Sequence, residues 1–336
     1  MDDGKYEEAI EAFEAMNGYK DSVEQITACE TGIKDEAYDA AVALMNDGKY
    51  EEAIAAFEAM NGYKDSVEQI AACETSIKDN AYDAAVALMK EGKYEEAIAA
   101  FEALNGYKDS TEKAESIKFE YEAQKMKYAE VGDYIYFGAY EQDNDKSNGK
   151  EDIEWLVLAK KDGKILVVSK YVLDFKEYNS EWVTSTWESC TLRQWLNSRF
   201  LKIAFTKVEQ TIIETTALTA EQNPMYYAYA GKDTEDKVFL LSINEASKYF
   251  SSNKARMCTP TAYAKAQGVI TWDQFGYYTR VNGGYTCAWL LRTPGDSKRA
   301  VRIEGDGSIL YEGDSVCSMY SCNIRPALWI DLDAIS

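Results

Sequence analysis

The sequence contains no histidine, and this absence limits the chemistry that the chain can perform. Histidine is the commonest general base, the usual partner that activates a nucleophile, and the commonest zinc ligand. The sequence also lacks a Gly-rich phosphate-binding motif and the Gly-x-Ser-x-Gly motif of serine hydrolases. These absences favour a binding protein over an enzyme, and we expect no cofactor and no metal ion.

Arginine, tryptophan and proline are missing from the first 130 residues, and cysteine is sparse throughout. The seven cysteines are an odd number without close paired spacing across the chain, which favours a reducing compartment. No apolar run is long enough for a membrane helix, and no signal peptide opens the sequence. We therefore expect a cytoplasmic protein. Because the sequence begins in the middle of a repeat unit, we also expect that an upstream segment precedes it.

Negative charge is concentrated in the first part of the chain. The formal net charge is −22, of which −18 falls within residues 1–130 and −4 within residues 131–336. An acidic segment repels a phosphate backbone, so we expect no nucleic-acid partner. The contrast in composition predicts two domains, 1–130 and 131–336.

The first domain consists of a repeat with a period of 44 residues. The sequence Gly-Lys-Tyr-Glu-Glu-Ala-Ile begins at Gly4, Gly48 and Gly92, and each copy is followed by Asn-Gly-Tyr-Lys-Asp-Ser. Apolar residues recur at helical spacing on both sides of the Asn-Gly pair, which can adopt positive φ where a helix ends. Each unit is therefore predicted to contain a short helix, a tight turn and a long helix of roughly 24 residues.

The start of the long helix carries a more detailed prediction. In the middle unit we expect Asp65 or Ser66 to cap this helix, with Glu68 and Gln69 placed for a capping box. The glutamate pairs that open the short helices suit the positive end of a helix dipole.

The repeat resembles tetratricopeptide-like helical hairpins, particularly in Gly-x-Tyr-x-x-Ala-x-x-x-Phe, although that family has a period of about 34 residues. Such arrays usually present a concave face to a partner, so the resemblance implies an arm that binds a protein or peptide. A spacer that only holds the second domain is the alternative. Cys29 and Cys73 lie one period apart, with Ile117 at the equivalent position, and we expect them to be buried as small apolar residues.

The second domain is predicted to be α+β, with antiparallel strands at both ends and helices between them. Asp162-Gly163 marks a hairpin, helical periodicity covers 186–197, and Thr206 with Glu209 predicts a capping box. The expected strands are 134–140, 153–159, 164–171, 238–242, 288–292, 300–304, 308–311 and 326–332, and further helices are expected at 244–250 and 261–267.

Five distinct motifs lie along this domain: Gly-x-Tyr-Glu-Gln-Asp-Asn-Asp at 138–145, Ile-Glu-Trp-Leu-Val-Leu at 153–158, Leu-Arg-x-Trp-Leu-Asn at 192–197, Trp-Leu-Leu-Arg-Thr-Pro-Gly at 289–295 and Ile-Arg-Pro-Ala-Leu-Trp-Ile at 324–330. Together they resemble an uncharacterised bacterial domain family that often follows helical repeats and carries no assigned activity.

The last strands also resemble the C-type-lectin-like fold, in the branch shared by formylglycine-generating enzymes and the variable proteins of diversity-generating retroelements. The resemblance implies a scaffold whose loops between the late strands form a ligand-binding face. It does not imply sugar binding, because the Glu-Pro-Asn and Trp-Asn-Asp triplets of calcium-dependent lectins are missing.

The stretch from 277 to 323 contains the residue types of antibody paratopes. Tyrosine supplies rigid contact area, and serine, asparagine and aspartate supply adaptable hydrogen bonds. We expect a ligand-binding face here, and ordinary solvated loops are the alternative. The candidate residues are Tyr277, Tyr278, Asn282, Tyr285, Asp296, Ser297, Arg302, Glu304, Tyr311, Asp314, Ser318, Tyr320 and Asn323.

A calcium site is a possible interpretation of the segment after 142. Asp143, Asp145, Ser147 and Glu154 match ligand positions of the calcium-loop template, but Asn148 stands where the template requires glycine. The flanking segments are also predicted strands instead of helices. We favour a polar hairpin loop, and the sequence leaves calcium binding by Asp143, Asp145 and Glu154 open.

Two further groups have both a functional and a structural interpretation. Cys287, Cys317 and Cys322 invite comparison with the cysteine-dependent formylglycine-generating enzymes, but free cysteines are commonly buried fillers. Arg292 and Arg325 lie in apolar, strand-like runs, where we expect them to bind buried carbonyl groups or a carboxylate. Contact with a ligand is the alternative.

We therefore expect a non-catalytic binding or adaptor protein, whose second domain recognises a ligand, most simply a protein. A retroelement-diversified receptor is a sharper form of this hypothesis. A cysteine-dependent enzyme related to the formylglycine generators and a purely structural scaffold component are the alternatives.

Overall fold

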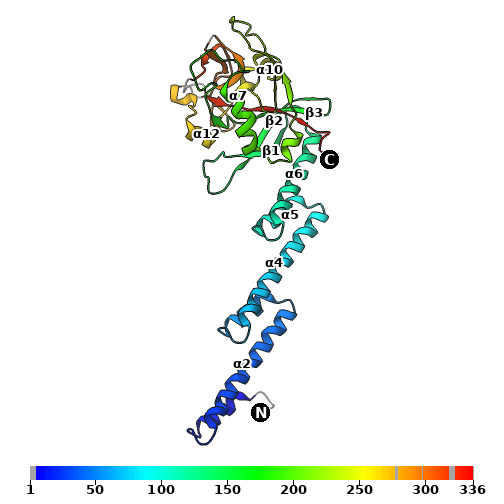
Figure 1. Ribbon diagram of the computed structural model, residues 1–336, viewed down its shortest axis with the longest axis vertical. Helices are drawn as coiled ribbons and strands as arrows, with labels where there is room; N and C mark the ends of the chain where they lie inside the picture. The colour runs from blue at the N-terminus through cyan, green and yellow to red at the C-terminus, as the bar shows by residue number, and fades with distance from the viewer. Residues whose placement is uncertain (1–4, 277–278, 297, 318–321, 336) are drawn as a thin grey trace. The chain divides into compact units, whose positions relative to one another are not determined.

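The computed structural model describes residues 5–276, 279–296, 298–317 and 322–335. The chain divides into two compact units between Lys118 and Phe119 (Figure 1). The first unit contains repeated helices, and the second contains antiparallel strands with short helices. The predicted combination of a helical-repeat region and an α+β domain is therefore confirmed.

Short and long helices alternate along the first unit, as the 44-residue period predicted. The long helices α2 and α4 are each 25 residues in length, close to the expected value. The helices in this part of the described chain are α1 (Tyr6–Glu14), α2 (Ser22–Asn46), α3 (Tyr50–Glu58), α4 (Ser66–Lys90), α5 (Tyr94–Ala103) and α6 (Ser110–Tyr128).

The turn between α3 and α4 combines a confirmed prediction with a wrong one. Asn61 and Gly62 have φ values of 51° and 81°, so this pair reverses the chain as expected. The predicted capping box is wrong, because no side chain caps α4. Asp65 accepts hydrogen bonds from the Tyr38 hydroxyl and from Gln69 Nε2 instead. A tertiary contact with the preceding long helix thus replaces the local cap.

Each junction between units carries the same polar arrangement, which we call the clasp. In the first clasp, Tyr63 Oη donates to Asp35 at 3.0 Å, and Lys64 Nζ lies 2.5 Å from the same carboxylate. Tyr38 donates to Asp65, and Lys64 Nζ stands 4.7 Å from the centre of the Tyr38 ring. The second clasp repeats these contacts one period later with Asp79, Tyr82, Tyr107, Lys108 and Asp109.

Apolar side chains fill the space beside each clasp. Phe57 and Ala53 are fully buried in a cluster that also includes Cys73. Cys29 is fully buried as well, and Ile117 occupies the equivalent position in the next cluster. The expected burial of the repeat cysteines is confirmed.

Four antiparallel strands form the main sheet of the second unit, in the order β1-β2-β3-β13 (Figure 1). Asp162 and Gly163, with φ values of 51° and 70°, connect β2 to β3 in the predicted hairpin. The last strand pairs along β3, so the first and last strands of the domain belong to one sheet. The bounds are β1 (Tyr134–Tyr140), β2 (Glu151–Lys161), β3 (Lys164–Ser169) and β13 (Ala327–Asp331).

The late strands form a second sheet in the order β11-β10-β9. Its strands are β9 (Trp289–Pro294), β10 (Arg299–Ile303) and β11 (Ile309–Ser315). Short pairs complete the described strands: β4 (Asp174–Phe175) with β12 (Asn323–Ile324), β5 (Thr216–Leu218) with β6 (Thr234–Asp236), and β7 (Arg280–Val281) with β8 (Gly284–Tyr285).

The predicted helix at 186–197 begins later than expected. The backbone N–H of Cys190 donates to Thr186 O at 2.9 Å, so the first residues form a turn instead. The helical segment then runs through α7 (Thr191–Trp195), the π-helix η1 (Leu196–Phe200) and α8 (Leu201–Ala204).

Two other short helices follow their sequence signals. Thr206 and Glu209 bond to each other's backbone N–H groups, which confirms the capping box at α9 (Glu209–Ile212). Gly268, with φ of 127°, ends α12 (Ala262–Gln267). The remaining helices in the described chain are α10 (Ile243–Tyr249), α11 (Asn253–Arg256) and the 3-10 helix η2 (Trp272–Phe275).

The predicted strand that begins at Val238 is wrong. This buried segment contains an isolated bridge from Phe239 to β13 but no regular strand. Side chains bind its backbone instead: Asn197 Oδ1 accepts from the N–H of Val238, and Arg292 Nη1 donates to Leu240 O at 3.0 Å. Main-chain bonds join Phe239 to Ala327 and the N–H of Arg292 to Leu241 O. Together these side-chain and main-chain bonds satisfy the buried backbone without a regular strand.

The two arginines in apolar runs have the architectural role that we expected. Arg292 binds the Glu245 carboxylate in addition to a carbonyl group. Arg325 Nε donates to Ser169 O at 2.9 Å, and its guanidinium lies 4.8 Å from the centre of the Trp289 ring. Both side chains are buried and hydrogen-bonded within the domain.

The core of the second unit includes the end of α6. Trp155, Trp289 and Tyr178 are buried in one continuous cluster, to which Ala123 and Met126 from α6 also belong. Among the described residues, no helix combines the length and the apolar character that crossing a membrane requires.

We expect Phe57→Ala to lower the free energy of unfolding of the repeats by about 3–5 kcal/mol, because it opens a cavity in a fully buried cluster. Phe13→Ala is the matched control, since Phe13 holds the same place in the first unit but is only half-buried. Far-ultraviolet circular dichroism follows the helices, and tryptophan fluorescence follows the second unit, where all seven tryptophans lie. Equal effects of the two substitutions would contradict the prediction.

Acid is expected to remove the contribution of the clasps. Hydrogen bonds from Lys64 and Lys108 lower the pKa values of Asp35 and Asp79 below 3.8. A lowered pKa in the folded state stabilises the protein above the unfolded-state pKa, and this stability is lost as the pH falls through the folded-state value. Asp35→Asn/Asp79→Asn should therefore melt below wild type at neutral pH, with a difference that shrinks below pH 3.8. A constant difference across that range would count against the clasps.

Candidate functional site

Four of the predicted binding residues line one pocket in the second unit, which we call the late-strand pocket. Arg302 is on β10, Glu304 follows it directly, Asp314 is on β11 and Asn323 is on β12. The volume of the pocket is about 320 Å³. Its lining residues are Ile270, Trp272, Phe275, Ala288, Arg302, Glu304, Asp314 and Asn323.

The charged wall of the pocket is built around Arg302. Its Nη1 lies 2.6 Å from Asp314 Oδ2, and its Nε donates to Glu304 Oε1 at 3.0 Å. An irregularity in the pairing of β10 with β11 falls between Ala300 and Arg302. Such a bulge re-aims side chains along a strand. Here Asp314 pairs with Ala300 in the strand register, yet its carboxylate bonds to Arg302.

This wall has an excess of negative charge. Two carboxylates, Glu304 and Asp314, share one guanidinium, and all three side chains are mostly but not fully buried. One negative charge is therefore left within the group at neutral pH. Partial burial weakens screening by water and salt, so this charge attracts a cationic group more strongly than an exposed carboxylate does.

The apolar wall of the pocket is built by the short helix η2. Trp272 lies directly over Gly305: a Cβ atom at Gly305 would stand 2.4 Å from the indole ring. The backbone N–H of Trp272 also donates to Thr286 O at 2.8 Å. Phe275, at the other end of η2, is 54% exposed at the edge of the pocket. The helix ends at Gly276, where φ is 82°.

Asn323 has a structural role at the base of the pocket. Its side chain is buried, and Nδ2 donates to Ala288 O at 2.8 Å. This bond ties β12 to the residue that precedes β9. Asn323 thus shapes the pocket by holding two of its lining segments together.

The other described candidates lie outside the pocket lining. Asn282 is exposed at the tip of the β7–β8 hairpin, and the Arg280 guanidinium lies 4.1 Å from the centre of the Tyr285 ring. Asp296 is exposed in the turn between β9 and β10, and Tyr311 packs against the core. Five candidates lie outside the described residues: Tyr277, Tyr278, Ser297, Ser318 and Tyr320.

Sequence reasoning missed the apolar half of the pocket. Ile270, Trp272, Phe275 and Ala288 were not among the candidates, because selection by polar and tyrosine content ignores apolar residues. Two aromatic residues three positions apart in a segment with polar neighbours, as in Trp-Asp-Gln-Phe, were the available signal.

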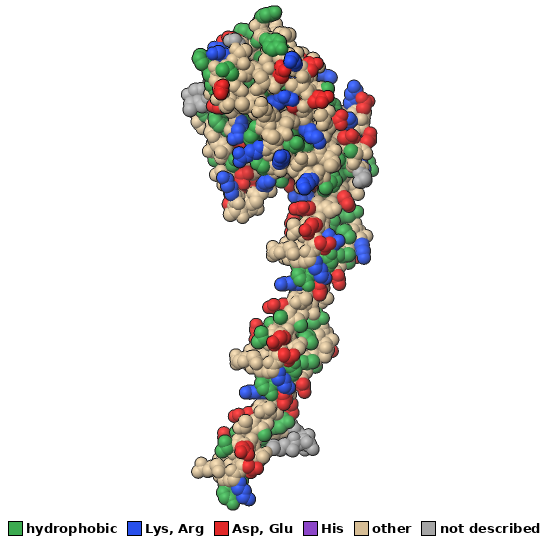
Figure 2. Space-filling view, in the orientation of Figure 1, with side chains coloured by type: hydrophobic (Ala, Val, Ile, Leu, Met, Phe, Trp, Pro, Cys, Tyr) green, Lys and Arg blue, Asp and Glu red, His purple; other side chains and the backbone are tan. Residues whose placement is uncertain are grey.

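A second exposed surface was also missed, in the loop that follows Asn223. Asn223 is buried, and its Nδ2 donates to Tyr311 O at 2.7 Å while its Oδ1 accepts from the N–H of Met225. The anchored loop projects from the domain (Figure 1), and hydrophobic side chains lie at this end of the domain (Figure 2). Tyr227 is completely exposed, and Tyr229 is two-thirds exposed. Exposed tyrosines on an anchored loop are suited to protein contact.

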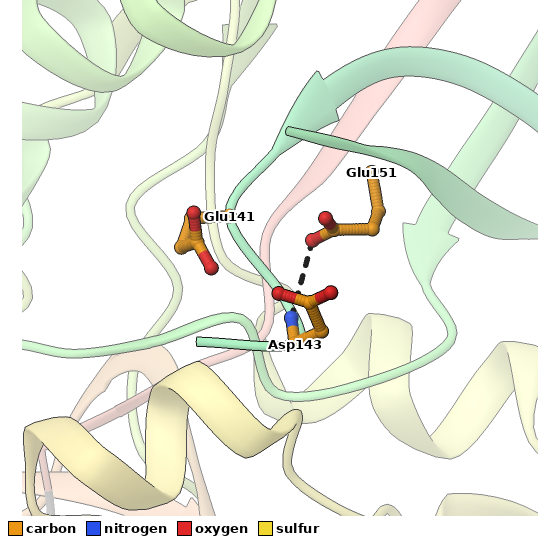
Figure 3. A group of neighbouring side chains, drawn as sticks. All are labelled: Glu141, Asp143 and Glu151. Carbon is orange, nitrogen blue, oxygen red and sulfur yellow. Dashed lines mark hydrogen bonds between the residues drawn. The ribbon is translucent and has the colours of Figure 1, made fainter. Parts of the chain in front are cut away.

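The acidic segment after β1 differs from the calcium-loop template. Glu154 pairs with Lys170 at 2.6 Å, and Asp145 binds Ser147. The carboxylates that converge are instead Glu141, Asp143 and Glu151, with ligand oxygens within 4.8 Å of one another (Figure 3). Glu154 does not belong to this group.

Local hydrogen bonds account for part of this acidic group. Glu151 Oε2 accepts from the backbone N–H groups of Gln142, at 2.6 Å, and Asp143, at 3.1 Å (Figure 3). Asp143 in turn accepts from the N–H of Asp145. Glu141 Oε1 is buried and has no hydrogen-bond partner. These carboxylates are the described residues whose oxygens lie close enough together to hold a cation.

The cysteines of the second unit lie in apolar surroundings. Cys258 and Cys287 are fully buried and pair through a backbone hydrogen bond of 2.9 Å. Burial raises the pKa values of both thiols, so they stay protonated at neutral pH. Cys322 is also buried, and Cys317 is half-buried beside Ser315. Within the described chain, no cysteine belongs to a group that could hold a metal ion.

Fold and site together define a helical-repeat protein with an α+β domain that carries a mixed aromatic and acidic pocket. Residues 162–332 match the family described as Domain of unknown function (DUF6273), and the match covers half of the chain. The chain therefore belongs to this family, which confirms the expected membership of a family without an assigned activity. No curated protein and no solved structure matches the sequence.

The contact between Trp272 and Gly305 gives a direct test of the pocket. We expect Gly305→Ala to displace the indole ring and to lower the free energy of unfolding of the second unit by about 1–3 kcal/mol, because the new methyl group has no room. Near-ultraviolet circular dichroism and denaturant unfolding measure the two effects. In Gly305→Ala/Trp272→Ala the loss should be smaller than the sum of the single losses, since the clash is gone. Additive losses would contradict the packing described.

Proposed function

We propose that this protein is a non-catalytic binding protein whose second unit captures a protein ligand in the late-strand pocket. The helical repeats serve as its scaffold or as a second protein-binding arm. The observation that supports the proposal is the convergence of four candidate residues on one pocket with aromatic walls. Pockets that bind ligands combine apolar walls with a few convergent polar groups.

The charges of the pocket favour a cationic ligand group. Arg302 is held by Glu304 and Asp314, and the remaining negative charge faces a space bounded by Trp272 and Phe275. Carboxylates attract ammonium and guanidinium groups, and aromatic faces bind the same cations. We therefore propose that a lysine or arginine side chain of the partner, with an apolar neighbour, enters the pocket.

The position of the pocket also supports a relation to the C-type-lectin-like fold. The polar lining residues come from β10, β11 and β12 and from the residue after β10. A ligand-binding face among late strands is what that fold implies. We likewise propose that the repeats are related to tetratricopeptide-like hairpins, on the strength of their short and long helix pairs.

The described candidates differ in how freely they can vary, which bears on the hypothesis of a retroelement-diversified receptor. Asn323 is buried and bonded to Ala288 O, so substitution there leaves a buried carbonyl group without its donor. Asn282 and Asp296 are exposed, and substitution there costs little. If the protein is diversified, we propose that variation is confined to exposed positions of this kind.

Thiol chemistry has less support than binding. Cys287, one of the three cysteines considered for catalysis, is fully buried with a raised pKa, whereas a reactive cysteine needs an accessible thiolate. A cytoplasmic location and the absence of nucleic-acid partners stay predictions from cysteine usage and acidic charge.

Selection of peptides from a random display library against the full chain tests the proposal. Peptides that bind are expected to contain lysine or arginine beside an apolar residue. Calorimetry on one such peptide should show that Asp314→Asn and Phe275→Ala each weaken binding about tenfold, a change of about 1.4 kcal/mol. Binding should also weaken as the salt concentration rises, because charge attraction is screened.

The loop after Asn223 supplies the matched control. Tyr227→Ala removes an aromatic side chain that is more exposed than Phe275 and does not line the pocket, so it should leave binding unchanged. If Tyr227→Ala abolishes binding while Asp314→Asn and Phe275→Ala bind as wild type does, the ligand site is the loop and our assignment is wrong. Circular dichroism of each variant confirms that the domain is folded.

A further inference from the structure

The three repeat units place the same residues in different surroundings. In the second and third units, Phe57 and Phe101 are fully buried, as are the alanines four positions before them. In the first unit, the equivalent Phe13 is only half-buried, and α1 contains no fully buried residue. The neighbouring residues Met16 and Tyr19 are 44% and 61% exposed.

The second and third units show what covers this face. The C-terminal half of α2 packs on α3, where the Tyr38 ring meets the Phe57 ring edge-on at 5.7 Å. One period later, Tyr82 of α4 meets Phe101 of α5 at 5.6 Å. In each case a long helix covers the short helix that follows it. Within the described chain, no long helix precedes α1.

The polar half of a clasp is also present in the first unit. Tyr19, Lys20 and Asp21 are the equivalents of Tyr63, Lys64 and Asp65. Lys20 has φ of 55°, against 51° for Lys64, so the loop already has the conformation found in complete clasps. A preformed loop lowers the entropy cost of binding.

We propose that this surface, the N-terminal face (Ala9, Phe13, Met16, Tyr19 and Lys20), binds a further long helix of the same repeat type. The partner helix carries Asp-x-x-Tyr followed by an apolar stripe, as residues 35–45 of α2 do. Its aspartate accepts from Tyr19 and pairs with Lys20. Its tyrosine donates to Asp21 and covers Phe13. The binding register is the one in which α2 binds α3.

A second copy of this chain does not carry a suitable helix. The clasp residues of α2 and α4 are already engaged within their own chain. In α6, Ala123 and Met126 stand at the positions equivalent to Asp35 and Tyr38 of α2, and both are buried in the core of the second unit. The partner of the N-terminal face is therefore a long helix other than α2, α4 and α6.

A labelled peptide with the sequence of residues 66–90 serves as the probe, because it contains an intact Asp79-x-x-Tyr82 motif. Fluorescence anisotropy should show that it binds the full chain and that Phe13→Ala weakens binding at least about tenfold. A peptide with Asp79→Asn and Tyr82→Phe should bind the wild-type chain more weakly than the unchanged peptide, by a similar factor. Val23→Ala is the matched control. Val23 and its equivalent Val67 are 62% and 63% exposed, so the partner helix does not cover this position.

A covalent form of the test removes the dependence on peptide affinity. A copy of residues 22–46 is joined ahead of the first unit, and hydrogen exchange is followed in α1. We expect exchange in Tyr6–Glu14 to slow at least about tenfold, because the helix loses its free face. The same extension with Asp35→Asn and Tyr38→Phe in the added copy should slow hydrogen exchange in α1 less.

Three outcomes would overturn the proposal. The first is unchanged exchange in α1 together with no peptide binding. The second is equal binding by the wild-type peptide and the Asp79→Asn/Tyr82→Phe peptide. The third is a dimer, seen by analytical ultracentrifugation, that Phe13→Ala abolishes, since this would assign the N-terminal face to a second copy of the chain. Loss of ligand binding in the late-strand pocket has no bearing on any of these outcomes.

Discussion

The structure of the second unit depends on side chains that satisfy buried backbone groups where regular strands end. Many of its strands are short, and the buried segment that begins at Val238 forms no regular strand. Arg292 and Arg325 bond to carbonyl groups in such places, and Asn197 bonds to the segment that precedes α10. Unbonded backbone groups in the interior cost far more than the net gain from making a bond. These few polar side chains therefore determine how the two sheets and the short helices fit together.

The pocket follows from the same constraint. Asn323 connects β12 by a hydrogen bond to Ala288, the residue before β9. The irregularity beside Arg302 allows the guanidinium of that residue to reach two carboxylates. What remains open is a space with one aromatic wall and one acidic wall. We propose that this combination binds a cationic group, and such binding requires no histidine, which the sequence lacks. The ordered loop after Asn223 offers a second, chemically different surface on the same domain.

The repeats are stabilised by one interface used twice. Each long helix covers the short helix of the next unit. A clasp of tyrosine, aspartate and lysine joins the same long helix to the turn that follows that short helix. Repeat arrays of this kind depend on contacts between neighbouring units. At the α6 end, Ala123 and Met126 replace the clasp residues and enter another core. Next to α1, Tyr19, Lys20 and Asp21 keep the polar residues and the loop conformation of a clasp.

Local patterns in the sequence were sufficient for much of the fold. The 44-residue period, the Asn-Gly turns, the Asp162-Gly163 hairpin and the Thr206–Glu209 capping box depend on residues close together in the chain, so each could be predicted. Buried positions in the repeats followed from helical spacing. Part of the candidate site was also found, because polar residues between late strands are conspicuous in the sequence.

Contacts between distant residues decided the rest. The segment after Val238 has the composition of a strand but is bonded by Asn197 and Arg292, and Asp65 accepts from Tyr38 of another helix instead of capping its own. Trp272 and Phe275 reach the pocket only because η2 packs beside Gly305. Periodicity and local propensity describe how a segment prefers to fold. Which side chains meet, and which polar groups they leave for a ligand, is determined when segments far apart in the chain pack together.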